Sequence, residues 1–215
     1  MKMNNHSSSG RKTHPYHIEE GAIKFRCLLD KGSSGISPNT FSLINSFRDQ
    51  LHQMGYIGVY PYGTGYGNIS IRKTASHCAF YITGTATGKY KTLSEEHYVL
   101  VTGYDTTANI VWCTGTLCAS SESMTHAVIY ETLPEINSVI HIHNLRMWQH
   151  CKGRLPETPE DVFYGTPAMV MALKNVIKDY SYNRIIRMAG HREGVIAFGK
   201  SPKEAFQQIL KNVPV

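Results

Sequence analysis

The chain has 215 residues, of which 41% are hydrophobic and 18% are charged. These values suit one globular domain and exclude a disordered chain, and no apolar run reaches the roughly 20 residues needed to cross a bilayer. The net charge of +6 comes from scattered Lys and Arg, so nucleic-acid binding is not expected. Binding of a small anionic substrate explains the positive charge better than nucleic-acid binding does, although solubility alone could also explain it.

The N-terminal segment is polar and lacks the apolar core of a secretory signal. We interpret residues 1–37 as a partly disordered N-terminal extension and residues 38–215 as a single domain. The five cysteines form no C-x-x-C pair, which predicts a reduced, cytoplasmic protein. Cys113 and Cys118 could be metal ligands, but one pair without a second is a weak indication.

The first half of the chain is predicted to form one helix followed by strands. The helix begins after Ser37, with Pro38 in its first turn and apolar residues at helical spacing until Gly55 ends it. Short β-branched or aromatic segments then predict strands at 56–60, 68–72, 78–83, 97–104 and 109–115. A helix is expected from Ser121 to Thr132.

The second half mixes strands and helices. A strand is expected at 137–143, helices at 145–151 and 167–180, two strands around Gly190–Glu193, and a last helix that begins after Ser201. The strands are too short and too close together for a doubly wound parallel sheet. The pattern therefore predicts an α/β fold of another kind.

Two histidines in an apolar strand are the first candidates for a metal site. His141 and His143 lie two residues apart, so their side chains share one face of the strand while Ile140 and Ile142 take the other. Both imidazoles could reach one ion at about 2.0–2.1 Å. The alternative is a pair of core histidines with hydrogen-bond partners. His191, in a Gly-flanked turn between two apolar strands, would complete three neutral histidines with an open position, which is a catalytic metal arrangement.

A glutamate at a predicted helix start is a candidate acid/base. Glu122 follows Ser120 and Ser121, and either serine could cap the helix and leave backbone N–H groups free for an anion. The alternative for Glu122 is an ordinary acid favoured by the helix dipole. His126 lies one turn later on the same helix face, where it could bond the carboxylate or simply pack.

Five segments occur in the order seen in class II aldolase/adducin domains: GNISIR (67–72), ITGTATG (82–88), SSE (120–122), VIHIH (139–143) and GHREGVIAFG (190–199). The chain thus resembles this superfamily over roughly residues 40–210, and its fuculose-phosphate-aldolase-like enzymes in particular. The resemblance implies a three-layer α/β/α sandwich around a mostly antiparallel central sheet. It also implies a homotetramer with fourfold symmetry.

The resemblance assigns roles to the candidate residues. It implies that His141, His143 and His191 hold one divalent metal ion, zinc first and otherwise manganese, cobalt or iron, and that Glu122 is the catalytic acid/base. Three pairs would hold the substrate phosphate through backbone N–H groups and hydroxyls, namely Gly67–Asn68, Thr87–Gly88 and Ser120–Ser121. Thr83–Gly84 is an equally good textual match for the second pair.

Some residues point to another branch or depart from the family pattern. DVFYGTPA (161–168) is similar to a segment of the ribulose-phosphate 4-epimerases in which Asp161 would be catalytic; the alternative is a loop acid. Epimerases usually have SSD, however, and the SSE of this chain is closer to aldolases and methylthioribulose-phosphate dehydratases. Arg192 and Glu193 stand where characterised enzymes have a small residue, and Arg192 could meet an anionic substrate or be a solvated turn residue. Aldolases of the family carry a longer C-terminal tail with a tyrosine that serves the neighbouring subunit; we do not expect that tyrosine to act here, and Tyr164 is a candidate substitute.

The expected activity follows from the resemblance and the candidate residues. We predict a metal-dependent carbon–carbon lyase, an aldolase, that acts on a small phosphorylated hydroxy-ketone through a metal-stabilised enediolate while Glu122 moves the proton. A sugar-phosphate 4-epimerase or a dehydratase of the same superfamily is the alternative. A non-catalytic, adducin-like interaction module is a further alternative, against which the complete set of metal-site residues argues.

Overall fold

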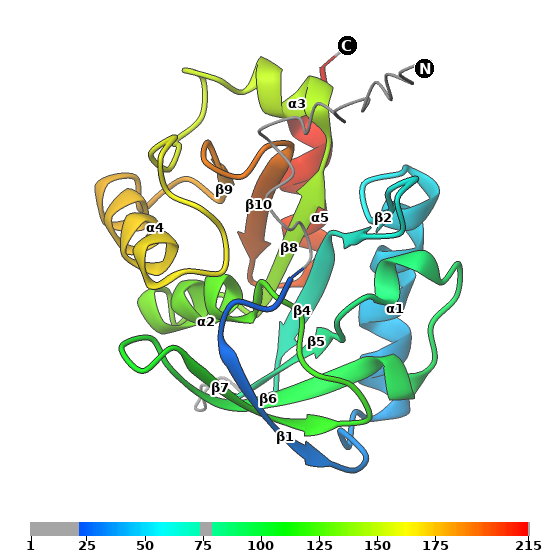
Figure 1. Cartoon of the computed structure of the whole chain (residues 1–215). Helices are drawn as coiled ribbons and strands as arrows, with labels where there is room; N and C mark the ends of the chain where they lie inside the picture. The colour runs from blue at the N-terminus through cyan, green and yellow to red at the C-terminus, as the bar shows by residue number, and fades with distance from the viewer. Residues whose placement is uncertain (1–21, 74–78, 215) are drawn as a thin grey trace, which may run out of the picture.

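The computed structural model describes residues 22–73 and 79–214 (Figure 1). Its centre is an eight-stranded sheet with the order β1-β7-β6-β5-β4-β8-β10-β9. β1 (Arg26–Lys31) runs parallel to β7 (Ile110–Gly115), and the other neighbouring strands of this sheet in the described chain pair antiparallel. The expectation of a mostly antiparallel central sheet is therefore confirmed.

The remaining strands lie close to their predicted positions. They are β4 (Asn68–Arg72), β5 (Phe80–Thr83), β6 (Tyr98–Asp105), β8 (Ser138–His143), β9 (Ile185–Arg187) and β10 (Gly194–Gly199). The strand expected at 56–60 is reduced to β2 (Gly58–Val59), which pairs with β3 (Gly65–Tyr66) in a separate two-stranded sheet. The turn between β2 and β3 passes through Gly63 at φ 94°, a conformation that glycine adopts without strain.

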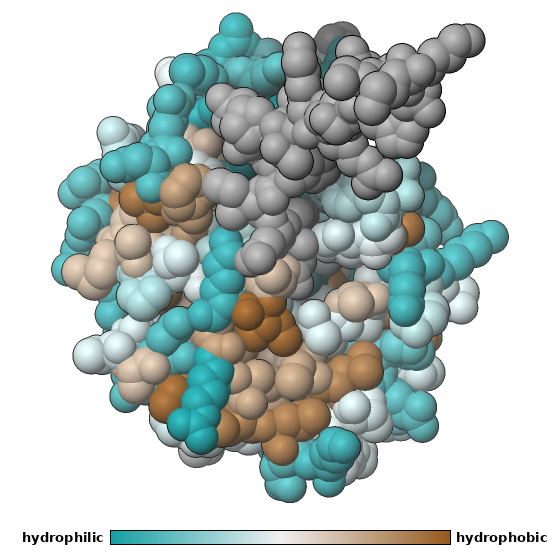
Figure 2. Space-filling view, viewed as in Figure 1, coloured by the Kyte–Doolittle hydropathy of each residue, from teal (hydrophilic) through white to brown (hydrophobic). Residues whose placement is uncertain are grey.

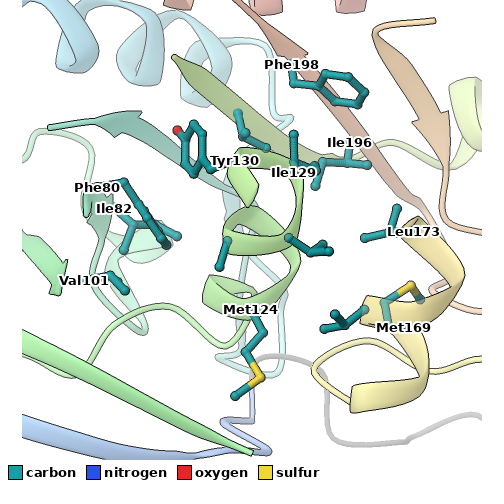
Figure 3. Packing of buried hydrophobic residues seen from close by; sticks show 14 of the residues in the cluster. Phe80, Ile82, Val101, Met124, Ile129, Tyr130, Met169, Leu173, Ile196 and Phe198 are labelled. Carbon is teal, nitrogen blue, oxygen red and sulfur yellow. The ribbon is translucent and has the colours of Figure 1, made fainter. Parts of the chain in front are cut away.

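Helices cover both faces of the sheet. α2 (Ser123–Thr132) and α4 (Pro167–Asp179) pack in one core cluster with residues from the strands, and Figure 3 shows Met124 and Ile129 of α2 between the sheet and Leu173 of α4. α1 (Pro38–Gln53), α3 (Leu145–His150) and α5 (Pro202–Lys211) contribute to a second cluster on the other face. The three-layer α/β/α arrangement is thus confirmed (Figure 1).

Three helices begin with the same local signal. Ser37, Thr166 and Ser201 each precede a proline, and the hydroxyl of each accepts a hydrogen bond from the backbone N–H three residues later, at 3.2 Å. A hydroxyl cap followed by proline satisfies a helix N-terminus whose first N–H groups have no partner within the helix. This signal explains why the starts of α1, α4 and α5 match the sequence prediction.

The first strand comes from the segment that we interpreted as an N-terminal extension. β1 joins the edge of the central sheet, and Phe25 beside it is buried. The boundary at residue 37 stays a prediction, but residues 22–37 already contribute to the sheet and its cores, whereas residues 1–21 lie outside the described chain. Apolar residues gather in the lower half of Figure 2, where Figure 1 places β1. Within the described residues, no helix is long and apolar enough to cross a membrane.

Candidate active site

Three buried histidines converge beside the end of β8. His141 and His143 come from β8, and His191 comes from the turn between β9 and β10. The three ring centroids are 4.7 to 4.9 Å apart, and one ring nitrogen from each lies within 4.8 Å of the other two. Ile140 and Ile142 pack into the core on the opposite face of the sheet. The alternation predicted for this strand therefore holds.

The chemistry of the three histidines fits a divalent metal ion. Burial, together with the neighbouring His143 and His191, holds the pKa of His141 well below its usual value, so the imidazole is neutral and can donate a lone pair. Within residues 22–73 and 79–214, neither ring nitrogen of His141 has a hydrogen-bond partner. A buried polar atom without a partner costs free energy, and a bound cation would remove this cost.

A buried carboxylate stands next to this cluster. Glu122 is 2% exposed, and its Oε1 lies 3.6 Å from Nδ1 of His191. It occupies the position just before α2, and the expected serine cap does not form. Ser120 Oγ instead accepts hydrogen bonds from Asn68 Nδ2 at 3.0 Å and from the backbone N–H of Glu122 at 3.4 Å, because the chain turns sharply between the two residues.

A pocket adjoins Glu122 and His141. Its lining contains the three segments expected to bind phosphate, within residues 65–68, 84–88 and 120–122. The structure therefore brings together the pairs Gly67–Asn68, Thr87–Gly88 and Ser120–Ser121. Of the alternative pair, Gly84 lines the pocket and Thr83 does not.

Backbone contacts shape two sides of the pocket. Gly88 lies so close to β2 that a Cβ atom there would stand 2.1 Å from the carbonyl oxygen of Gly58. Gly67 has a φ of +73°, and a Cβ there would lie 2.9 Å from the carbonyl oxygen of Tyr56. Both positions therefore require glycine, which allows the walls of the pocket to pack this closely against neighbouring backbone.

A buried arginine supports the 84–91 loop from α1. The Arg48 guanidinium donates hydrogen bonds to the carbonyl oxygens of Thr87 at 3.3 Å, Lys91 at 2.8 Å and Tyr90. It also forms an ion pair with Asp49 at 3.1 Å. These bonds fix the carbonyl side of the loop, so its conformation depends on α1.

Residues 62–211 match the sequence model of the class II aldolase and adducin N-terminal domain family. The chain belongs to this family. Methylthioribulose-1-phosphate dehydratase from Leptospira biflexa serovar Patoc is 32% identical to it over 106 residues, in the Ames and Paris strains alike. The matched part is 48% of this chain and 48% of the dehydratase, so the chain spans about half the length of the curated relatives it matches.

Three solved structures share the fold of this chain. An L-fuculose 1-phosphate aldolase superposes with a TM-score of 0.62 at 20% identity, over 84% of each chain. The L-fuculose-1-phosphate aldolase from Thermus thermophilus gives 0.58 at 17% identity, over 79% of this chain and 87% of that one. YgbL from Klebsiella pneumoniae gives 0.60 at 17% identity, over 82% and 86%. Identities of this size show a common fold alone.

The other predicted site residues take different positions. Tyr164 is buried and stacks on the ring of His191 at 4.5 Å between centroids, and the Lys24 Nζ atom lies 3.9 Å from the Tyr164 centroid. Asp161 is exposed and does not line the pocket. Arg192 lines a separate hollow beside Trp148, and its side chain is 65% exposed. The roles of Tyr164, Asp161 and Arg192 therefore stay predictions.

Sequence reasoning missed several residues of the site. Tyr60 and Tyr66 contact the His143 ring, and the sequence feature that could have identified them is the tyrosine-rich run YPYGTGY (60–66) just before the first family motif. Lys24 had no signal, because it precedes β1 in the segment interpreted as an extension. Arg48 reads in the sequence as an ordinary polar position of α1, and only the tertiary structure shows its burial.

Proposed function

We propose that this member of the class II aldolase family is a metal-dependent lyase that acts on a small phosphorylated hydroxy-ketone. One observation carries the proposal: three buried histidines, a buried carboxylate and a pocket lined by the three segments predicted to bind phosphate meet at one place. Neutral imidazoles in a mutually close set are suited to a catalytic metal, and perturbed titratable groups beside a pocket are typical of an active site.

The three histidines, His141, His143 and His191, would hold the ion, and zinc is the first candidate because imidazole nitrogen suits it. Such an ion, when bound, polarises a carbonyl group and stabilises negative charge that develops on it. Glu122 would hold or move the proton, since its carboxylate is buried within reach of this site. The pocket walls would take the phosphate, through N–H groups and hydroxyls of Ser120–Ser121 and the facing loops.

Cleavage of a carbon–carbon bond is the first candidate reaction. In that case Glu122 takes the proton of the substrate hydroxyl, the adjacent carbon–carbon bond breaks to release an aldehyde, and its electron pair forms an enolate that takes the proton back from Glu122 to give the ketone. Dehydration is the second candidate, because the 32% identical relative is a methylthioribulose-1-phosphate dehydratase. Here Glu122 takes a proton from the carbon beside the carbonyl, and the hydroxyl on the next carbon leaves with a proton as water. Epimerisation stays an alternative that the exposed Asp161 does not favour.

The first test is elemental analysis of the purified protein beside the His141→Ala/His143→Ala double variant. We expect about one divalent ion per wild-type chain and none in the variant. The metal-loaded protein is then incubated with phosphorylated ketoses, methylthioribulose 1-phosphate among them, and cleavage, dehydration and epimerisation products are separated. Wild-type protein without metal after reconstitution with zinc, manganese, cobalt and iron would contradict the proposal and favour the adducin-like interaction module.

The proposal includes assembly as a homotetramer. β1 is an edge strand, and its residues Cys27, Leu28 and Leu29 are only half-buried, in a region where Figure 2 shows apolar surface. Edge strands and apolar patches are typical sites of association. Sedimentation equilibrium is expected to give a mass of four chains, and a monomer at micromolar concentration would contradict this part of the proposal.

A further inference from the structure

A tyrosine hydroxyl connects one of the histidines to a glutamate. The Tyr60 hydroxyl lies 2.8 Å from Nδ1 of His143 and 3.0 Å from Oε2 of Glu193, to which it donates a hydrogen bond. Tyr60 belongs to the tyrosine-rich loop beside β2, and Glu193 belongs to the turn after His191. The three side chains thus link both segments that carry the candidate metal ligands.

The hydrogen bond from Tyr60 to Glu193 constrains which nitrogen of His143 carries the proton. A tyrosine hydroxyl has one proton, and Tyr60 donates it in the hydrogen bond to the Glu193 carboxylate, which can only accept. A lone pair of the Tyr60 oxygen can then accept a hydrogen bond from an N–H group at Nδ1 of His143, 2.8 Å away. A neutral imidazole with its proton on Nδ1 has its lone pair on Nε2, so this arrangement selects the tautomer in which Nε2 can bind a metal.

The backbone of Glu193 supports a role for its side chain. Glu193 has a φ of +69°, a left-handed conformation that favours glycine and costs free energy in other residues. The carbonyl oxygen of Glu193 accepts a hydrogen bond from the backbone N–H of Asn144 at 2.9 Å, which fixes the turn against the end of β8. Glycine would adopt this turn without strain, so the glutamate is explained by what its carboxylate contacts.

The aromatic neighbours hold the tyrosine ring in place. The Tyr60 ring stacks on Tyr62 with centroids 5.1 Å apart and an interplanar angle of 9°, and it contacts Tyr66 at 4.5 Å. Tyr66 in turn lies 5.5 Å from the His143 ring and lines the pocket. A ring held by two others positions its hydroxyl with little freedom, as an orienting group requires.

We propose that Tyr60 and Glu193 are positioning residues that set the tautomer and orientation of His143 and thereby raise the affinity of the site for its metal. The inference rests on the proposed metal site and concerns two side chains, Tyr60 and Glu193, to which the family resemblance assigns no role. Partners of this kind are typically worth about 10- to 100-fold in metal affinity. Their effect therefore belongs to metal binding first and to turnover only as a consequence.

The test compares zinc affinities, measured by competition with a chromophoric chelator, in the full-length protein. We expect Tyr60→Phe to bind zinc about 10- to 100-fold more weakly than wild type. Glu193→Gly should show a similar loss although its melting temperature is unchanged or higher, because glycine relieves the backbone strain at φ +69°. Glu193→Gln, whose amide oxygen can still accept from Tyr60, should lie between wild type and Glu193→Gly.

A matched control removes a hydroxyl elsewhere. Tyr81→Phe loses a hydrogen bond to the carbonyl oxygen of Gly35 at 3.1 Å and should bind zinc as wild type does. Nitrogen NMR of the metal-free protein gives a readout that needs no metal: wild-type His143 should carry its proton on Nδ1, and Tyr60→Phe should show a mixture of tautomers. Equal zinc affinities of wild type and Tyr60→Phe, or a wild-type His143 protonated on Nε2, would overturn the inference alone. A wild type that binds no zinc would overturn the proposed metal site instead.

Discussion

Oε1 of Glu122 lies 3.6 Å from Nδ1 of His191, and both side chains are only 2% exposed. The pair joins the start of α2 to the turn before β10, so the candidate acid/base and a candidate metal ligand depend on the packing of two separate elements. Water is largely excluded from this contact, and a carboxylate in such a place can exchange protons with a substrate without competition from solvent.

We expect Glu122→Gln to lose turnover by at least about 100-fold while the metal content stays at the wild-type level, because the amide has the same shape and cannot take a proton. Steady-state rates on the substrate found by screening, together with elemental analysis of the same sample, check this. A Glu122→Gln protein that kept full activity would show that another group moves the proton.

The pocket wall at Gly88 gives a second prediction. A Cβ atom at this position would collide with the carbonyl oxygen of Gly58 at 2.1 Å, so Gly88→Ala must displace the loop that lines the pocket. We expect a destabilisation of about 1–3 kcal/mol and a raised KM for the phosphorylated substrate. Gly32→Ala is the control, because nothing lies within 4 Å of its Cβ and its φ is not left-handed. Similar KM values for both variants would refute the role of this wall.

Much of the site was predictable because its residues lie in local patterns. His141 and His143 alternate with apolar residues in one strand, so their common face follows from the geometry of a β-strand. The glycines at 67 and 88 stand in short motifs where the backbone leaves no room for a Cβ atom, and the serines before Glu122 stand in another short motif. These segments also come together in the pocket as expected.

The rest depends on contacts between distant parts of the chain. Tyr60 and Glu193 are 133 positions apart, and no local pattern says that their side chains meet. β1 pairs in parallel with β7, which lies far along the chain, so its sequence alone looked like part of an extension. The serine cap expected for α2 does not form, because the Ser120 hydroxyl accepts a hydrogen bond from Asn68 of β4 instead.

The loop support by Arg48 yields a third prediction. Its side chain is 1% exposed, and three carbonyl oxygens of the 84–91 loop depend on it. Arg48→Met keeps the length of the side chain but leaves these acceptors without a donor, so we expect a loss of about 3 kcal/mol in the free energy of unfolding. Urea denaturation measures it. Arg26→Met at the exposed start of β1 is the control, with an expected change within about 0.5 kcal/mol.

A buried histidine outside the candidate ligand set gives a pH-dependent prediction. His126 is fully buried in α2, and its Nδ1 lies 2.7 Å from the hydroxyl of Ser70, which also contacts the Tyr130 hydroxyl at 2.7 Å. Burial lowers the pKa of His126 from 6.5 to about 3. Between these pH values the unfolded chain binds a proton that the folded chain does not. The stabilising contribution of neutral His126 to the free energy of unfolding is therefore fully present above pH 6.5 and is lost as the pH falls toward 3.

The difference in unfolding free energy between wild type and His126→Gln should therefore shrink as the pH falls. The unfolding free energy of His126→Gln at pH 8 should be lower because the buried bond to Ser70 is disturbed, and the gap should close by about 1.4 kcal/mol per pH unit below about pH 6.5. Chelator is present throughout, so that metal binding does not contribute. Tyr130→Phe removes the neighbouring hydroxyl and leaves His126 buried, so its gap to wild type should stay constant with pH. A constant gap for His126→Gln as well would mean that His126 takes up its proton in the folded protein, and that the core around α2 is open to water.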